Sequence, residues 1–155
     1  MESRRKALAP RIPPRILLAE EEDGLRHSMA LMLKQAGCTV GLARGVMEAA
    51  RLLRESQGSM AAYDLFIVDL GDATAESCRL LVEWFDGEGI VVPYLVIYED
   101  AGDRAVGYLA ENGCLACISK PFEPNALLQG VRRAIGREWQ PDSFSGKVAG
   151  CDQTQ

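Results

Sequence analysis

Short apolar segments alternate with amphipathic helical segments along most of this chain. The apolar segments have the length of buried strands, and they cover residues 16–19, 39–43, 65–68, 91–98 and 115–118. The segments between and after them carry apolar residues at helical spacing, and they cover residues 24–36, 46–55, 75–85, 101–111 and 124–135. Five strands alternating with five helices predict a doubly wound α/β domain with a parallel sheet, in the flavodoxin-like order 2-1-3-4-5.

The segment 65–68 is the strand around which the prediction is built. Its four apolar residues run without a break, and Asp69 stands where the strand is expected to end, with residues 70–73 turning away. In open α/β sheets, ligands bind beyond the carboxyl ends of the strands. Taken alone, Asp69 would more often cap the next turn than carry chemistry, so its neighbours in the sheet decide the interpretation.

Other charged residues end neighbouring strands at the same edge of the predicted sheet. Glu20 and Glu21 follow the first strand, which lies beside the third, so both are expected to converge with Asp69. Three carboxylates together suit a hard cation such as Mg²⁺. Lys120 follows the fifth strand and could contact an anion held there. This set favours a phosphoryl-transfer site with Asp69 as the acceptor.

Three motifs in this order resemble the receiver domains of two-component response regulators. They are ILLAEE at 16–21, LFIVD at 65–69 and SKPF at 119–122, within a match that extends over residues 15–139. The resemblance implies that Asp69 is the phospho-acceptor and that Lys120 contacts the phosphoryl group. It also implies that Glu20, Glu21, Asp69 and the main-chain carbonyl of Gly71 hold Mg²⁺, and that the Lys120–Pro121 bond is cis.

The same resemblance implies a signalling role rather than an enzymatic one. A receiver accepts a phosphoryl group from a histidine kinase or phosphotransfer protein and presents a surface to a downstream effector protein. Only about 16 residues follow the predicted domain, so the sequence favours a receiver that acts without an output domain.

Several positions depart from the family pattern. Both metal-binding acids are glutamates, Tyr98 stands where the family has Thr or Ser, and Cys117 replaces the switch aromatic. We expect the Tyr98 ring to point outward, because burying a phenol beside carboxylates would desolvate those charges. These changes keep a second hypothesis open, in which the chain is a pseudo-receiver that acts as a constitutive protein–protein interaction module.

Cys114 and Cys117 form a C-x-x-C motif, which raises a thiol redox function as a third possibility. Redox pairs of that kind open a helix, where the dipole lowers the thiol pKa. Here the second cysteine lies inside a predicted strand, so the sequence favours a buried structural role.

Composition narrows the domain organisation, the partners and the location expected for this protein. A length of 155 residues with 48% apolar content suits one domain, here residues 15–139 between a flexible basic leader (1–14) and a flexible tail (140–155). The formal net charge of −5 does not favour nucleic acid as a partner, and no apolar run approaches the roughly 20 residues of a membrane span. Five cysteines and no secretory signal favour reduced thiols and a cytoplasmic location.

Overall fold

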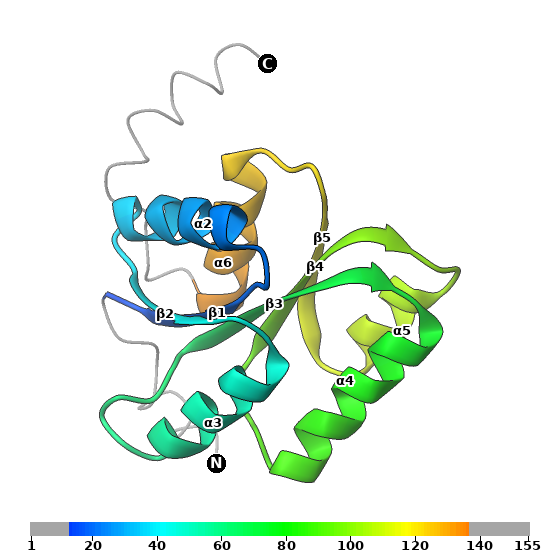
Figure 1. Ribbon diagram of the computed structural model, residues 1–155, viewed down its shortest axis with the longest axis horizontal. Coiled ribbons are helices and arrows are strands. Elements are labelled where there is room, and N and C mark those ends of the chain that lie inside the picture. Colours follow the sequence, from blue (N-terminus) through cyan, green and yellow to red (C-terminus); the bar gives the residue numbers. More distant parts are fainter. Residues whose placement is uncertain (1–12, 137–155) are drawn as a thin grey trace.

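The computed structural model describes residues 13–136, so the predicted tail and most of the predicted leader lie outside the described residues. Five parallel strands form one sheet in the order β2-β1-β3-β4-β5, which confirms the predicted flavodoxin-like topology (Figure 1). The strands are β1 (Arg15–Ala19), β2 (Thr39–Ala43), β3 (Leu65–Ala73), β4 (Tyr94–Ala101) and β5 (Cys114–Ser119). The helices are α2 (Asp23–Gln35), α3 (Val46–Ser56), α4 (Ala75–Glu88), α5 (Ala105–Glu111) and α6 (Pro124–Ile135).

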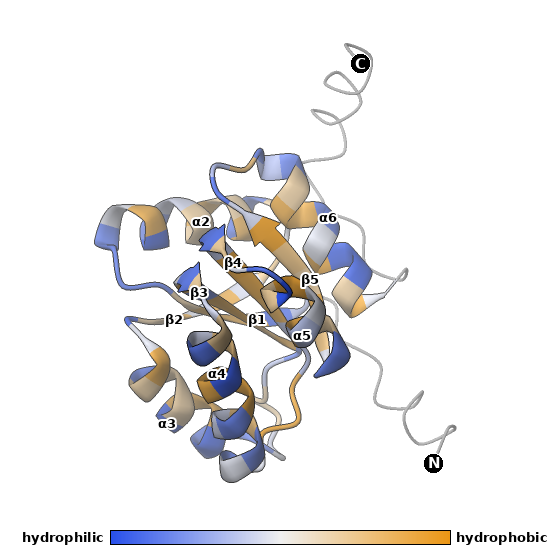
Figure 2. Cartoon of the chain, turned by 90° about the vertical axis from the view of Figure 1, so that its right-hand side faces the viewer, coloured by the Kyte–Doolittle hydropathy of each residue, from blue (hydrophilic) through white to orange (hydrophobic). Residues whose placement is uncertain are grey.

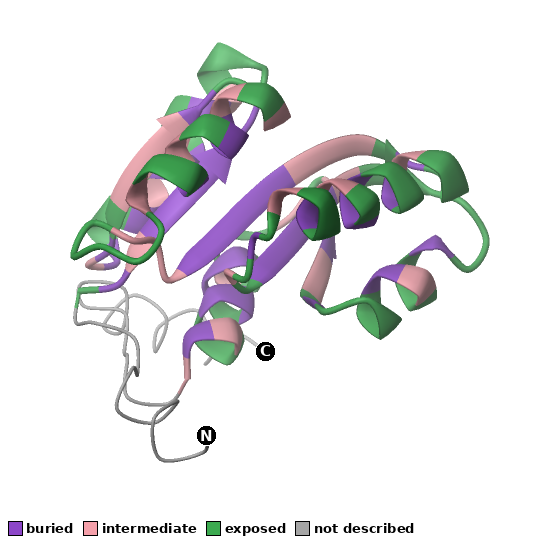
Figure 3. Cartoon of the chain, turned by 90° about the horizontal axis from the view of Figure 1, so that it is seen from below, coloured by how far each residue is buried: buried purple, intermediate pink, exposed green. Residues whose placement is uncertain are grey.

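Helices cover both faces of the sheet, so the central strands are buried on both sides (Figure 3). Helices α2 and α6 lie over one face and α3, α4 and α5 over the other (Figure 1). Successive residues of a strand point to opposite faces. Ile67 therefore packs under α2 and α6, whereas Phe66 packs under α4 against Trp84 and Phe85. This two-sided burial explains why the strands are continuous apolar runs in the sequence.

The third and fourth strands extend further than the sequence predicts. Residues 70–73 were expected to turn away after Asp69, but they continue β3 beside the end of β4, with Gly71 paired to Tyr98 and Ala73 to Ala101. Gly71 has a φ of 68°, a left-handed conformation that glycine adopts without steric cost, and the register shifts on both sides of it. The prediction of a turn here was wrong.

Packing at the far end of β3 explains the extension. The Ala73 side chain is fully buried, in the same cluster as Ala105 of α5, and the Gly102 amide donates a hydrogen bond of 3.0 Å to the Ala73 carbonyl. The hydrophilic ends of both strands stand out in Figure 2, and this polarity is what made the segment look like a turn. Because β4 continues to Ala101, α5 also begins later than predicted.

Among residues 13–136, no helix is long and apolar enough to cross a lipid bilayer.

Candidate functional site

The carboxyl ends of β1 and β5 and the middle of β3 bring an acid, a lysine and a second acid together. Asp69 follows Val68, which is paired with Ala19 immediately before Glu20. Lys120 follows β5 and reaches Asp69 past β4, held by a backbone hydrogen bond of 2.8 Å from its N–H to the Tyr98 carbonyl. The Lys120 ammonium forms an ion pair with Oδ2 of Asp69. The structure therefore places both residues where the sequence predicts them.

Asp69 is held in one orientation by these partners. Its Oδ1 accepts a hydrogen bond of 2.8 Å from the Gly71 N–H, while Oδ2 faces Lys120. Its side chain is only 5% exposed. Burial alone would raise the pKa of Asp69, but contacts with Glu20, Lys120 and the Gly71 N–H outweigh it, so the pKa is lowered. The same ion pair outweighs the desolvation of Lys120 and raises the pKa of its ammonium.

Glu20 is the second buried carboxyl of the site. It is 5% exposed, its N–H donates to the Ala43 carbonyl at 3.0 Å, and its Oε2 accepts from the Glu22 N–H at 3.0 Å. Its Oε1 is buried and receives no hydrogen bond from the described residues. Burial, and then the neighbouring Asp69, raise the pKa of Glu20 to about 7. Two ionised carboxylates side by side repel, so the neighbouring Asp69 favours the protonated form of Glu20.

The structure does not bring Glu21 into this site. Glu21 is exposed, and among residues 13–136 no three acidic, histidine or cysteine side chains are grouped so that they could hold a metal ion. Consecutive residues leaving a strand point in opposite directions, so only one of two adjacent acids can turn inward. The expectation that three acids converge is corrected to a pair, Glu20 and Asp69.

Arg26 fixes the acidic loop, and the sequence analysis did not select it. This buried side chain of α2 donates hydrogen bonds to the carbonyls of Glu20 at 2.8 Å and Glu21 at 3.4 Å, and it pairs with Asp23. The sequence did contain a signal for this role, because Arg26 is a cation near the start of the helix that follows the two acids. Arg26 is a positioning residue, because it holds the backbone that carries Glu20.

The oxygen atoms at this site supply some of the ligands that a hard cation needs. Glu20 and Asp69 supply two buried carboxylates, and an oxygen of Glu20 has no donor. Oxygen ligands of this kind suit Mg²⁺, and a cation there would take the place of the proton on Glu20. Gly71 lies beside the pair, with its N–H already bound to Asp69. The Lys120–Pro121 bond is cis, as the resemblance implies.

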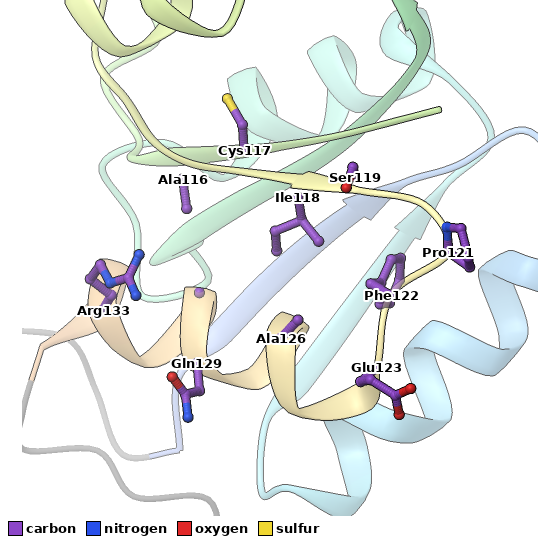
Figure 4. A pocket seen from close by; sticks show the side chains of 11 residues that line it. Ala116, Cys117, Ile118, Ser119, Pro121, Phe122, Glu123, Ala126, Gln129 and Arg133 are labelled. Carbon is purple, nitrogen blue, oxygen red and sulfur yellow. The ribbon is translucent and has the colours of Figure 1, made fainter. Parts of the chain in front are cut away.

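The two atypical positions lie on the same face of the sheet. Tyr98 and Cys117 are both half-buried, and both pack against the hydrophobic cluster under α4 and α5. Cys117 points to the side of β5 opposite Ala116 and Ile118 (Figure 4). The other side of β5 opens to a hollow of about 450 Å³ between this strand and α6. Asp69 does not line it.

Comparison with known proteins identifies relatives, although no family model matches the sequence. The response regulator Rre1 of Synechocystis sp. is 30% identical over 135 residues, which cover 86% of this chain and 56% of that protein. The regulatory protein SphR of Synechococcus elongatus, named for alkaline phosphatase synthesis, is 32% identical over 132 residues, or 79% of this chain and 49% of that protein. This chain thus spans about half the length of these relatives.

Solved structures agree on the fold. A response regulator from Thermotoga maritima superposes with a TM-score of 0.64 at 22% identity, over 80% of this chain and 98% of that one.

Proposed function

Because this chain carries a receiver domain of the two-component response-regulator family, we propose that it accepts a phosphoryl group on Asp69 in a signalling pathway. The observation that carries the proposal is the ion pair between buried Asp69 and Lys120, with Glu20 beside it at the same sheet edge. An acceptor carboxylate needs a fixed orientation and a nearby cation for the incoming phosphoryl oxygens, and this arrangement provides both.

In the proposed reaction an Asp69 oxygen attacks the phosphorus of a phosphohistidine or of a small acyl phosphate. The bond from phosphorus to the donor breaks, the donor leaves with its electron pair, and an acyl phosphate forms on Asp69. Lys120 moves its contact from the carboxylate to the phosphoryl oxygens. Glu20, Asp69 and the Gly71 carbonyl would hold Mg²⁺, and Glu21 stays outside this set because its side chain is exposed. When bound, the ion neutralises charge on the transferring group.

The proposal includes partners and boundaries. A histidine kinase or phosphotransfer protein would supply the phosphoryl group, and an effector protein would recognise the resulting surface. The domain would extend over residues 15–139, of which the structure describes all but the last three.

A second candidate function is a constitutive protein–protein interaction module. The observations that favour it are Tyr98 and Cys117 at the switch positions and the exposed Glu21. In this case Asp69→Asn would leave the binding of a partner protein unchanged. In the phospho-accepting receiver the same variant would lose every response to a phosphodonor.

The two atypical positions, Tyr98 and Cys117, predict that the structural response to a phosphoryl group is small. Tyr98 already packs in the cluster under α4 and α5, where Cys117 leaves space for it. We therefore expect Mg²⁺ with beryllofluoride, a phosphoryl mimic, to shift amide NMR signals around Asp69 and Lys120 but to change those of α5, β5 and α6 only slightly.

A matched variant, Tyr98→Thr with Cys117→Tyr, should enlarge the shifts of α5, β5 and α6, and Asp69→Asn should abolish all of them. Large shifts across these three elements in the unmodified protein would contradict the role given to Tyr98. Absence of any shift would contradict the phospho-accepting function itself.

A further inference from the structure

The C-x-x-C pair on β5 has a geometry that its sequence spacing does not predict. Residues three apart in a regular strand point to opposite faces and lie roughly 10 Å apart along the backbone, too far for a disulfide. In this structure the two sulfur atoms of Cys114 and Cys117 are 3.7 Å apart. The two thiols therefore meet in spite of lying within one strand.

A bulge in β5 brings the thiols together. Tyr94 pairs with Cys114 and Leu95 pairs with Ala116, so one residue of β5, Leu115, has no partner in the register. Leu115 is accordingly exposed. The extra residue turns the rest of the strand by one position, which places Cys114 and Cys117 on the same face, in the same cluster.

The two thiols differ in character. Cys114 is buried, whereas Cys117 is half-buried. The contact with the Cys114 sulfur, despite burial, lowers the pKa of Cys117, and the same contact and burial raise the pKa of Cys114. Cys117 is thus the more nucleophilic of the two, with Cys114 placed to react second.

We propose that Cys114 and Cys117 are a redox modification site that forms a reversible intramolecular disulfide with a low-molecular-weight disulfide as the oxidant. The Cys117 thiolate attacks one sulfur of the oxidant, releasing one thiolate and leaving a mixed disulfide on Cys117. Cys114 loses its proton and attacks the Cys117 sulfur, which forms the protein disulfide and releases the second thiolate. Two electrons pass from the protein to the oxidant, which is reduced to two thiols, and an excess of thiol reverses the reaction.

Bridge formation requires the sulfur atoms to close from 3.7 Å to the roughly 2.05 Å of a disulfide, through side-chain rotation and backbone movement at the bulge. Asp69 takes no part, so the site does not depend on the proposed phosphoryl transfer, and Asp69→Asn should oxidise as the unmodified protein does.

The test uses the full chain equilibrated with mixtures of reduced and oxidised glutathione. Each sample is quenched in acid and alkylated in denaturant, so that buried thiols also react, and is then read by intact mass and peptide mapping. The chain has five cysteines. We expect five alkylated thiols in reduced glutathione and a loss of two in oxidised glutathione, with one bridge mapped between Cys114 and Cys117.

Variants separate the two steps. Cys114→Ser should form no bridge and should accumulate glutathione on Cys117, whereas Cys117→Ser should form neither the bridge nor an adduct at Cys114. The matched control, Cys38→Ser, removes a buried thiol from the opposite face of the sheet and should leave the bridge intact. Five alkylatable thiols at every glutathione ratio, or a bridge between any other pair in the unmodified chain, would overturn the proposal.

Discussion

Replacing Lys120 with methionine is expected to lower the free energy of unfolding by about 3 kcal/mol near pH 7.5. The side chains of Lys120 and Asp69 are 20% and 5% exposed, so the substitution leaves a carboxylate buried without its cation. Glu20 lies against the same carboxylate and adds repulsion when it is ionised. Chemical denaturation followed by circular dichroism measures the change.

Two further variants test the cause of this loss. Asp69→Asn combined with Lys120→Met should cost less than half as much as Lys120→Met alone, because no unpaired charge remains. Lys34→Met removes an exposed cation from the last turn of α2 and should change stability by no more than about 0.5 kcal/mol. A Lys120→Met protein as stable as the unmodified one would contradict the ion pair as a stabilising contact.

Glu20 is expected to make the metal-free protein lose stability as the pH rises from about 4.5 to about 7. Burial and the neighbouring Asp69 raise the pKa of Glu20 from 4.5 to about 7, so the folded state binds a proton that the unfolded state releases. Its contribution is therefore fully present below the unfolded pKa and is lost as the pH passes through the folded one. A shift of this size corresponds to about 3 kcal/mol.

The measurement is the free energy of unfolding against pH in buffer containing a chelator. Glu20→Gln keeps the shape of the side chain without the titration, so the unmodified protein should lose about 3 kcal/mol relative to this variant between pH 4.5 and 7.5. Glu21→Gln removes the exposed charge of the adjacent residue and should leave the pH-dependent loss of stability unchanged. Parallel curves for the unmodified protein and Glu20→Gln would show that Glu20 is not protonated beside Asp69.

The apolar strands and the sheet order could be predicted from the sequence because burial on both faces leaves a local signal. The segment at 65–68 is apolar throughout, and every one of its side chains is buried. The extension of β3 to Ala73 has no such signal. It depends on pairing with β4 and on burial of Ala73 in the cluster that also contains Ala105, and both involve residues distant in sequence.

The site shows the same division between local and distant information. The closeness of Asp69 and Lys120 could be predicted, because each follows an apolar segment of the sheet, although β3 itself continues past Asp69 to Ala73. Which of Glu20 and Glu21 turns inward could not be predicted, since adjacent glutamates are chemically equal and Arg26 donates hydrogen bonds to the main-chain carbonyls of both. The contact between Cys114 and Cys117 depends on the bulge at Leu115, and no residue type in this segment predicts a bulge.

The central claim, that Asp69 accepts a phosphoryl group, is tested most directly by intact mass after incubation with Mg²⁺ and acetyl phosphate. The account predicts a gain of one phosphoryl group on the unmodified protein, an equal gain on Asp72→Asn, which alters an exposed neighbouring aspartate, and no gain on Asp69→Asn. No gain on the unmodified protein, or an equal gain on Asp69→Asn, would contradict it.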